Sequence, residues 1–134
     1  MKIAIVASEF NPEVTEPLLA ECLRGLKEQG IEPLVTRVPG AVEIPLTAQK
    51  IIRNERPDAV IALGCVIKGE TEHYDLVCTM CGDGIMATML ETGVPIIFEV
   101  LMVDDEKKAL ARIPKGYEAA FTAVKMAKLI RNAS

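Results

Sequence analysis

Two apolar stretches that lack polar residues at alternate positions constrain the fold of this chain most. They run from Ile3 to Val6 and from Asp58 to Ile67, and both are rich in β-branched residues. A strand with one face in water alternates apolar and polar residues, whereas a strand covered on both faces reads as a continuous apolar stretch. The sequence therefore predicts two buried strands, with the second near the centre of a parallel sheet.

Segments with helical spacing of apolar residues separate these strands from two others. A polar loop, Ser8–Pro12, follows the first strand, and apolar residues then recur at helical spacing until Gly30. Proline and glycine bound the remaining elements. The sequence predicts strands at 33–38 and 95–101, helices at 44–52 and 104–112, a third long helix after the loop 64–69, and a last helix after residue 116.

The two last long helices carry more detailed expectations. We expect Thr71 to cap the start of the third helix. Gly82 and Gly84 each cost about 1 kcal/mol relative to alanine inside a helix, which favours tight packing against another backbone as their reason. In the last helix we expect these residues to face inward: Tyr117, Phe121, Val124 and Ile130.

The alternation of strands and helices predicts the fold class. Crossovers between parallel strands are right-handed and place helices on both faces of the sheet. We expect a three-layer α/β sandwich of flavodoxin-like type, with a four-stranded parallel sheet flanked by helices. A chain of 134 residues has room for one core, so the whole of 1–134 is expected to be one domain. Ligands of such sheets bind outside the carboxyl ends of the strands.

Composition excludes several classes of function. A net charge of −4 and a pI near 5.1 have the wrong sign for general binding of nucleic acid. The longest apolar stretches, 59–67 and 94–103, are too short to cross a bilayer, so no membrane association is expected. The N-terminal run lacks the pattern of a signal peptide, which predicts a cytoplasmic protein. Hydrophobic residues make up 50% of the chain, which favours burial against a partner subunit.

The cysteines do not predict a metal site. Cys78 and Cys81 have the spacing of a redox or metal pair, but a zinc ribbon needs a second such pair. The chain has a single histidine, and a catalytic metal needs more ligands than this. We expect reduced thiols that act as small apolar side chains.

The loop from Gly64 to Thr71 resembles a nucleotide-binding P-loop but carries Glu70 where that motif has lysine. A carboxylate there would repel the terminal phosphates of a nucleotide. Backbone N–H groups at the start of a helix still suit a single phosphate. A glycine-rich turn without a ligand is the alternative.

Several single residues near the strand ends have both a structural and a functional interpretation. His73 could transfer protons near neutral pH or be structural. Phe10 could stack on a planar heterocycle or anchor its loop on the core. Glu43 could favour a helix dipole or accept hydrogen bonds from a ligand. Arg112 and Lys115, with Glu118 nearby, could clamp an anion or be surface charges.

Four motifs together resemble the 6,7-dimethyl-8-ribityllumazine synthase family, nearly end to end and in family order. They are Phe10-Asn11, Pro39-Gly-Ala-Val-Glu-Ile-Pro45, Ala62-Leu-Gly-Cys-Val-Ile-Lys-Gly-Glu-Thr71 with His73, and Lys115-Gly-Tyr-Glu-Ala-Ala120. The resemblance implies condensation of 5-amino-6-(D-ribitylamino)uracil with 3,4-dihydroxy-2-butanone 4-phosphate, the penultimate step of riboflavin biosynthesis. It implies no cofactor and no metal.

The resemblance also assigns roles to residues of this chain. His73, Lys115 and Glu118 would be catalytic, with His73 as a proton shuttle. Phe10 would stack on the pyrimidine, and the phosphate end would be held by Gly69, Glu70 and Thr71 together with Arg112. The remaining substrate-binding residues would be Asn11, Ala41, Val42, Glu43, Val66, Ile67 and Phe98.

Family sites lie at subunit interfaces, so the resemblance implies a homopentamer, either alone or closed with others into a 60-subunit icosahedral shell. A neighbouring subunit would supply Phe98, Arg112, Lys115 and Glu118. This chain departs from the family pattern because only Ile113 and Pro114 separate Arg112 from Lys115, where typical members have a longer glycine-rich stretch. Two alternatives stay open: a weakened relative that binds a flavin or lumazine or serves in assembly, and a riboflavin synthase of archaeal type.

Overall fold

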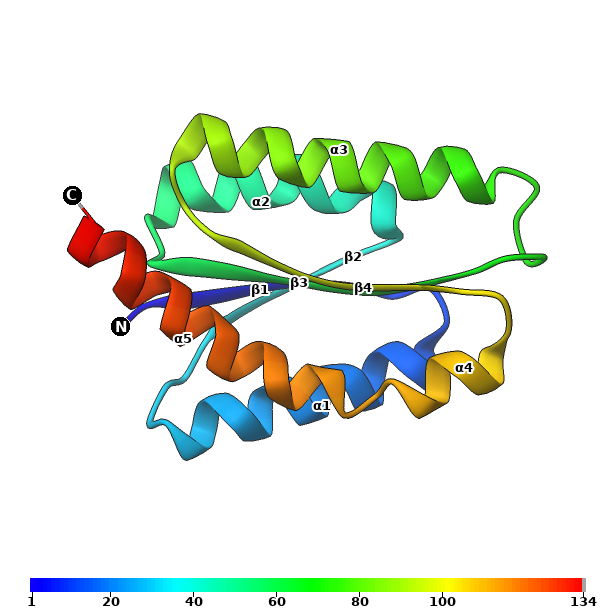
Figure 1. The fold of residues 1–134 in the computed structure, drawn as a ribbon, viewed down its shortest axis with the longest axis horizontal. Helices are drawn as coiled ribbons and strands as arrows, with labels where there is room; N and C mark the ends of the chain where they lie inside the picture. Colours follow the sequence, from blue (N-terminus) through cyan, green and yellow to red (C-terminus); the bar gives the residue numbers. More distant parts are fainter. Residues whose placement is uncertain (134) are drawn as a thin grey trace.

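A computed structural model describes residues 1–133 as a parallel sheet between two layers of helices (Figure 1). Within this range the sheet has four strands in the order β2-β1-β3-β4, and every neighbouring pair is parallel. The strands are β1 (Ile3–Ser8), β2 (Leu34–Val38), β3 (Ala59–Ile67) and β4 (Ile96–Val103). The expected four-stranded, flavodoxin-like α/β sandwich is confirmed.

Helices from two parts of the chain cover each face of the sheet (Figure 1). One layer contains the short 3₁₀ turn η1 (Ala41–Glu43), α2 (Ile44–Glu55) and α3 (Tyr74–Thr92). The other contains α1 (Pro12–Glu28), α4 (Glu106–Ala111) and α5 (Lys115–Ala133). Because every neighbouring pair of strands is parallel, all four strands run toward the same end of the molecule. The loops that follow the strands meet there.

The central strands β1 and β3 are buried along their whole length, as the uninterrupted apolar stretches predict. Alternate side chains enter different cores, since successive residues of a strand point to opposite faces. Ile61 and Leu63 join the core under α1 and α5. Val60 and Ala62 join the core under α2 and α3.

The buried face of α5 differs from the expectation. It consists of small residues, whereas Phe121 and Ile130 are exposed and Tyr117 and Val124 are half-buried. The prediction that these four residues face inward is therefore wrong for Phe121 and Ile130. The reason is the close approach of α5 to α1, which leaves no room for large side chains. The buried face is formed by Gly116, Ala119, Ala120, Ala123 and Ala127.

The expectations for α3 are met in part. The helix begins at Tyr74 and Thr71 does not cap it, because the Thr71 hydroxyl oxygen accepts a hydrogen bond from the His73 N–H, 3.2 Å away. Gly84 does permit tight packing, since a Cβ there would lie 2.7 Å from a ring carbon of Pro45, a side chain rather than a backbone. Gly82 meets no atom of the described chain within 4 Å of such a Cβ. Among residues 1–133, no helix combines the length and apolar character needed to cross a membrane.

The close contact of α1 and α5 predicts a large effect of one methyl group. A Cβ at Gly116 would lie 2.2 Å from the backbone oxygen of Leu18, so Gly116→Ala should force the helices apart. We expect a loss of about 2 kcal/mol in the free energy of unfolding, typical of an overpacked core, measured by urea denaturation. Thr122→Ala, on the exposed side of the same helix, should change stability by less than about 0.5 kcal/mol. Equal effects of the two substitutions would contradict the packing argument.

Candidate active site

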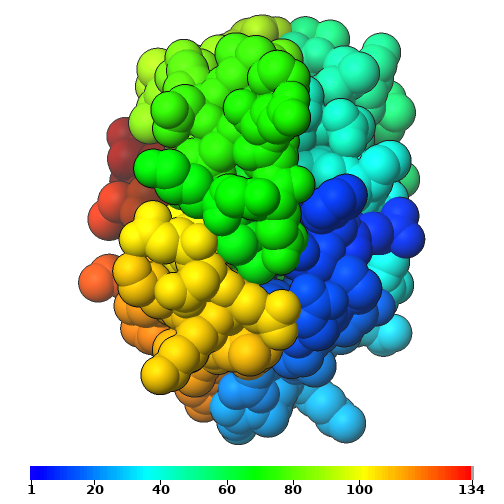
Figure 2. Space-filling model, turned by 90° about the vertical axis from the view of Figure 1, so that its right-hand side faces the viewer, coloured from blue at the N-terminus to red at the C-terminus, as the bar shows by residue number. Residues whose placement is uncertain are grey.

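The loops after β1, β2, β3 and β4 meet at one end of the molecule (Figure 2). In this view the segment after β3, in green, lies between the segment after β4, in yellow, and those after β1 and β2, in dark blue and cyan. The sheet thus brings together side chains that are far apart in the sequence. This is the end at which ligands bind in open parallel sheets.

A cavity of about 190 Å³ opens here between η1, the start of α1 and the end of β3. Its walls are largely apolar, with carboxylates at Glu43 and Glu70. Most residues expected to bind substrate line it. The predicted residues on its wall are Phe10, Asn11, Ala41, Val42, Glu43, Val66, Ile67, Glu70 and Thr71, and Gly40, Cys65 and Val77 complete the lining.

Asn11 fixes the loop on one side of this cavity. Its backbone is left-handed, with φ at 61°, and it stands immediately before the first residue of α1. Its buried side-chain amide donates a hydrogen bond to the backbone oxygen of Cys65, 3.0 Å away. This bond joins the loop after β1 to β3 and leaves Phe10 at the cavity with 62% of its surface exposed. A loop anchor packed on the core would be buried, so the exposed ring favours the stacking interpretation.

Glu43 already has a structural partner. Its carboxylate accepts a hydrogen bond from the Gly40 N–H, 2.9 Å away, which closes the 3₁₀ turn η1. The structural and functional interpretations of Glu43 are therefore compatible, since a carboxylate oxygen has further lone pairs for a ligand N–H. The turn also holds Ala41 and Val42 against the cavity.

The segment between β3 and α3 forms a second, more open depression beside the cavity. Gly69 has a φ of +95°, which glycine adopts without steric cost. Thr71 contributes to both depressions, and Lys68, Gly69 and His73 belong to the second. His73 is the residue that precedes the first residue of α3 and is exposed. A histidine and the N–H groups of a helix start are thus available next to the apolar cavity.

The other predicted residues form a second group along β4 and the junction of α4 and α5. They are Phe98, Arg112, Lys115 and Glu118. Phe98 lies on the edge strand β4, paired with Ala62, and is 40% exposed. Arg112 directly follows the last residue of α4, and Lys115 and Glu118 form an ion pair of 3.7 Å in the first turn of α5. In the described chain, none of these four lines the cavity. One chain therefore assembles only part of the predicted site.

Glu99 is a charged residue of this second group that the sequence analysis did not assign to the site. It is half-buried on β4, with Ile97 and Leu101 on the same face of the strand. Burial raises the pKa of the Glu99 carboxyl, Lys115 and Arg112 oppose this rise in pKa, and Glu118 adds to it. The available signal was a single carboxylate inside an apolar strand, which is costly unless cations lie nearby.

The cysteine thiols are poorly suited to redox or metal chemistry. Burial raises the pKa of Cys81 to about 11 and also raises that of Cys78, so both are protonated at neutral pH. Over residues 1–133, no three His, Cys, Asp or Glu side chains gather in a group that could hold a metal ion.

The role of Asn11 generates a prediction. Asn11→Ala removes the bond to the Cys65 oxygen and places alanine at a φ of 61°. We expect a loss of about 2 kcal/mol in the free energy of unfolding, from an unpaired buried carbonyl and left-handed strain. Asn11→Gly should lose about 1 kcal/mol less, because glycine tolerates this backbone. Urea denaturation of both variants separates the effect of the lost hydrogen bond from that of backbone strain. Equal losses in the two variants would show that backbone strain does not contribute.

The environment of Glu99 generates a second prediction. Because burial raises its pKa, the folded protein binds a proton at Glu99 more tightly than the unfolded chain does. The ionised carboxylate therefore lowers stability at pH 7, and this loss fades as the pH falls through the raised pKa. Glu99→Gln should be more stable than the parent at pH 7, with a difference that shrinks toward pH 4. Denaturation at several pH values, with the exposed Glu32→Gln as control, would refute this if the difference grew on acidification.

Comparison with known proteins shows the family of the chain. The family profile described as 6,7-dimethyl-8-ribityllumazine synthase matches residues 1–131. A protein of that name from Azoarcus sp. (strain BH72) is 45% identical, with 98% of this chain and 86% of the relative aligned. Those from Nitrosospira multiformis and Pyrococcus furiosus are 43% and 42% identical, with 98% of this chain and 84% and 86% of the relatives aligned. The chain therefore belongs to the 6,7-dimethyl-8-ribityllumazine synthase family.

Proposed function

We propose that this enzyme is a transferase of riboflavin biosynthesis that condenses 5-amino-6-(D-ribitylamino)uracil with 3,4-dihydroxy-2-butanone 4-phosphate. The products are 6,7-dimethyl-8-ribityllumazine, phosphate and water. The observation that carries this proposal is the convergence of three separate family motifs on one apolar cavity at the carboxyl ends of the strands. Family membership over nearly the whole chain supports it further.

The shape of the cavity supports a division of roles. The exposed ring of Phe10 provides a flat apolar surface for the pyrimidine. Asn11, Val42, Glu43 and the strand end Val66–Ile67 line the same space and would surround the pyrimidine and its ribityl chain. A cavity with apolar walls and a few polar groups fixes the orientation of such a ligand.

The second depression suits the phosphate end of the butanone. Gly69 and Thr71 line this depression and would place backbone N–H groups around the phosphate just before α3. Glu70 lines the adjoining cavity, and its N–H already donates to the Ile67 oxygen, 3.2 Å away. The Glu70 carboxylate at the adjoining cavity disfavours a highly charged nucleotide, and cations are needed nearby to balance even a single phosphate. Arg112 and Lys115 of the second group carry that charge.

The chemistry needs alignment more than a strong nucleophile. The amine attacks the ketone to form an imine, phosphate leaves, and ring closure with loss of water gives the lumazine. His73, exposed beside the depression, would move protons between these steps. Holding both substrates in one orientation removes much of the entropic barrier.

We further propose that the site is completed by a second copy of the chain. The cavity and the second group lie on different parts of the surface, which supports a head-to-tail contact rather than a two-fold one. Large apolar side chains are exposed beside both parts, on α3 and β4. They are Leu76, Met80, Met86, Leu90 and Phe98. A homopentamer, alone or within a 60-subunit shell, would cover them.

The localisation belongs to the same proposal. We place the enzyme in the cytoplasm, where small phosphorylated substrates are retained. Its four cysteines are free thiols, which agrees with a reducing compartment.

The proposed reaction can be tested directly. Lumazine formation, followed by absorbance with both substrates, should exceed the rate of an enzyme-free blank and require the butanone phosphate. His73→Ala should lower kcat by about 10- to 100-fold, at or below the lower end of the usual effect of acid–base groups, because the substrates also react unaided. A rate equal to the blank would sink the proposal. Conversion of lumazine alone to riboflavin would instead indicate a riboflavin synthase.

Complementation between two variants tests whether the site is shared by two copies of the chain. Phe10→Ala damages the cavity, and Arg112→Ala damages the second group and should raise KM for the phosphorylated substrate. When equal amounts are unfolded together and refolded as mixed rings, about a quarter of the interfaces should pair two intact halves. We expect about a quarter of the unmutated activity, well above either variant alone. No gain on mixing would place the whole site within one chain.

A further inference from the structure

The first turn of α5 has two opposite faces. Successive residues of an α-helix are about 100° apart, so Gly116 and Tyr117 lie on one side of the turn and Lys115 and Glu118 on the other. Burial agrees with this, since Gly116 is buried and Tyr117 half-buried, whereas the Lys115 and Glu118 side chains are exposed. The face toward α1 therefore determines where the opposite face presents its ion pair.

Backbone contact fixes how closely this turn approaches α1. A Cβ at Gly116 would lie 2.2 Å from the Leu18 oxygen, and one at Gly25 would lie 2.7 Å from the Ala120 Cβ and 3.0 Å from the Tyr117 oxygen. Such contacts set the separation of the two helices. They also fix which side of α5 faces α1, because only small residues fit there. They carry no directional bond, so the finer orientation of the first turn is left to other groups.

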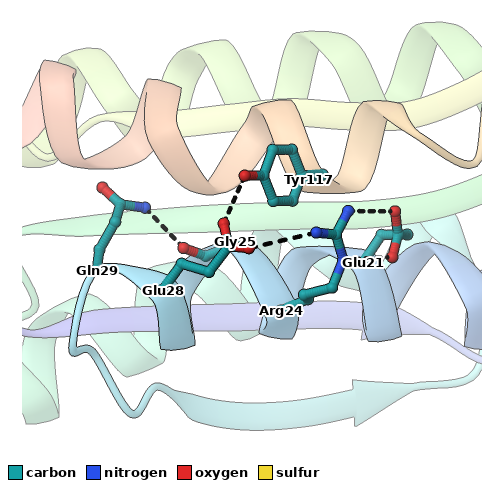
Figure 3. Close-up of polar contacts among 6 residues, drawn as sticks. All are labelled: Glu21, Arg24, Gly25, Glu28, Gln29 and Tyr117. Atoms are coloured by element: carbon teal, nitrogen blue, oxygen red, sulfur yellow. Dashed lines mark hydrogen bonds and ion pairs between the residues drawn. The ribbon is translucent and has the colours of Figure 1, made fainter.

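Tyr117 supplies the directional contacts (Figure 3). Its hydroxyl donates a hydrogen bond of 2.5 Å to the Glu28 carboxylate. The Arg24 guanidinium lies 4.1 Å from the centre of the Tyr117 ring, and two of its nitrogens donate to Glu21, each at 3.0 Å. A third nitrogen of Arg24 lies 3.4 Å from Glu28. Tyr117 thus joins the first turn of α5 to Arg24 and Glu28 of α1, and through Arg24 to Glu21.

We propose that Tyr117 is a positioning residue, which with Glu28 and Arg24 sets the orientation of α5 so that Lys115 and Glu118 face the phosphate end of the neighbouring subunit's site. This inference rests on the proposed function. Surface ion pairs contribute little to stability, about 0–1 kcal/mol each. Their geometry matters more at a site, where small displacements of a binding group cost much of the rate.

The decisive variant is Tyr117→Phe, which keeps the ring under Arg24 and removes only the hydroxyl bonded to Glu28. We expect KM for the butanone phosphate to rise about threefold to tenfold, while KM for the pyrimidine stays unchanged. Arg24→Met, which removes the cation over the ring, should change the same constant in the same direction. Both are measured by initial rates over a series of concentrations of each substrate.

Two further variants separate positioning from stability. Glu16→Gln breaks a 3.2 Å ion pair between α1 and Arg37 of β2, which involves no residue of α5, and should leave both KM values unchanged. In a Lys115→Met background, Tyr117→Phe should add little to the rise in KM, since the residue it positions is gone.

The outcomes distinguish this inference from the proposed function. An unmutated protein with no activity above the blank would sink both. An active protein whose KM for the butanone phosphate is unchanged by Tyr117→Phe, or whose Tyr117 and Lys115 effects add fully, would overturn the positioning role alone. A lower melting temperature without a change in KM would likewise overturn that role and leave Tyr117 as a stabilising residue.

Discussion

Burial of β3 on both faces is the constraint on which the rest of the structure depends. All nine of its residues are buried, and it pairs with β1 on one side and β4 on the other. A parallel strand buried on both faces needs helices over both faces and crossovers of the chain between strands. The loop after Ile67 is then the first segment beyond β3 that can carry polar side chains. The cavity lies where this central strand ends.

Most of the fold could be predicted because it follows from local patterns. Apolar runs, proline and glycine marked every strand and helix to within a few residues. The buried face of α5 could not be predicted in this way, since it depends on how close α1 approaches. At that distance no side chain larger than that of alanine fits between the two helices, so Phe121 is exposed. For the same reason the need for glycine at position 116, which comes from its contact with the Leu18 backbone, cannot be predicted from the spacing of apolar residues.

The candidate site could be predicted to the extent that it lies at strand ends. Phe10, Val42 and Thr71 belong to three loops that the parallel topology brings to one cavity. Phe98 and Lys115 do not line that cavity within one chain. The proposal that a second chain brings them to it concerns a contact about which a pattern within one chain carries no geometric information. Glu99 was missed because a carboxylate in an apolar strand has meaning only once Lys115 and Arg112 are placed beside it.

The short junction between α4 and α5 has a consequence for the entropy of ligand binding. The Lys115 N–H bonds to the Arg112 oxygen, 2.9 Å away, and the Gly116 N–H to the Ile113 oxygen, 3.1 Å away, so the two cations share one hydrogen-bonded turn. Ordering a flexible loop costs about 1–2 kcal/mol per residue. Here the backbone of the junction is ordered when the chain folds, so an anion bound as proposed would not have to order it. Only the exposed side chains of Arg112 and Lys115 would then lose freedom on binding.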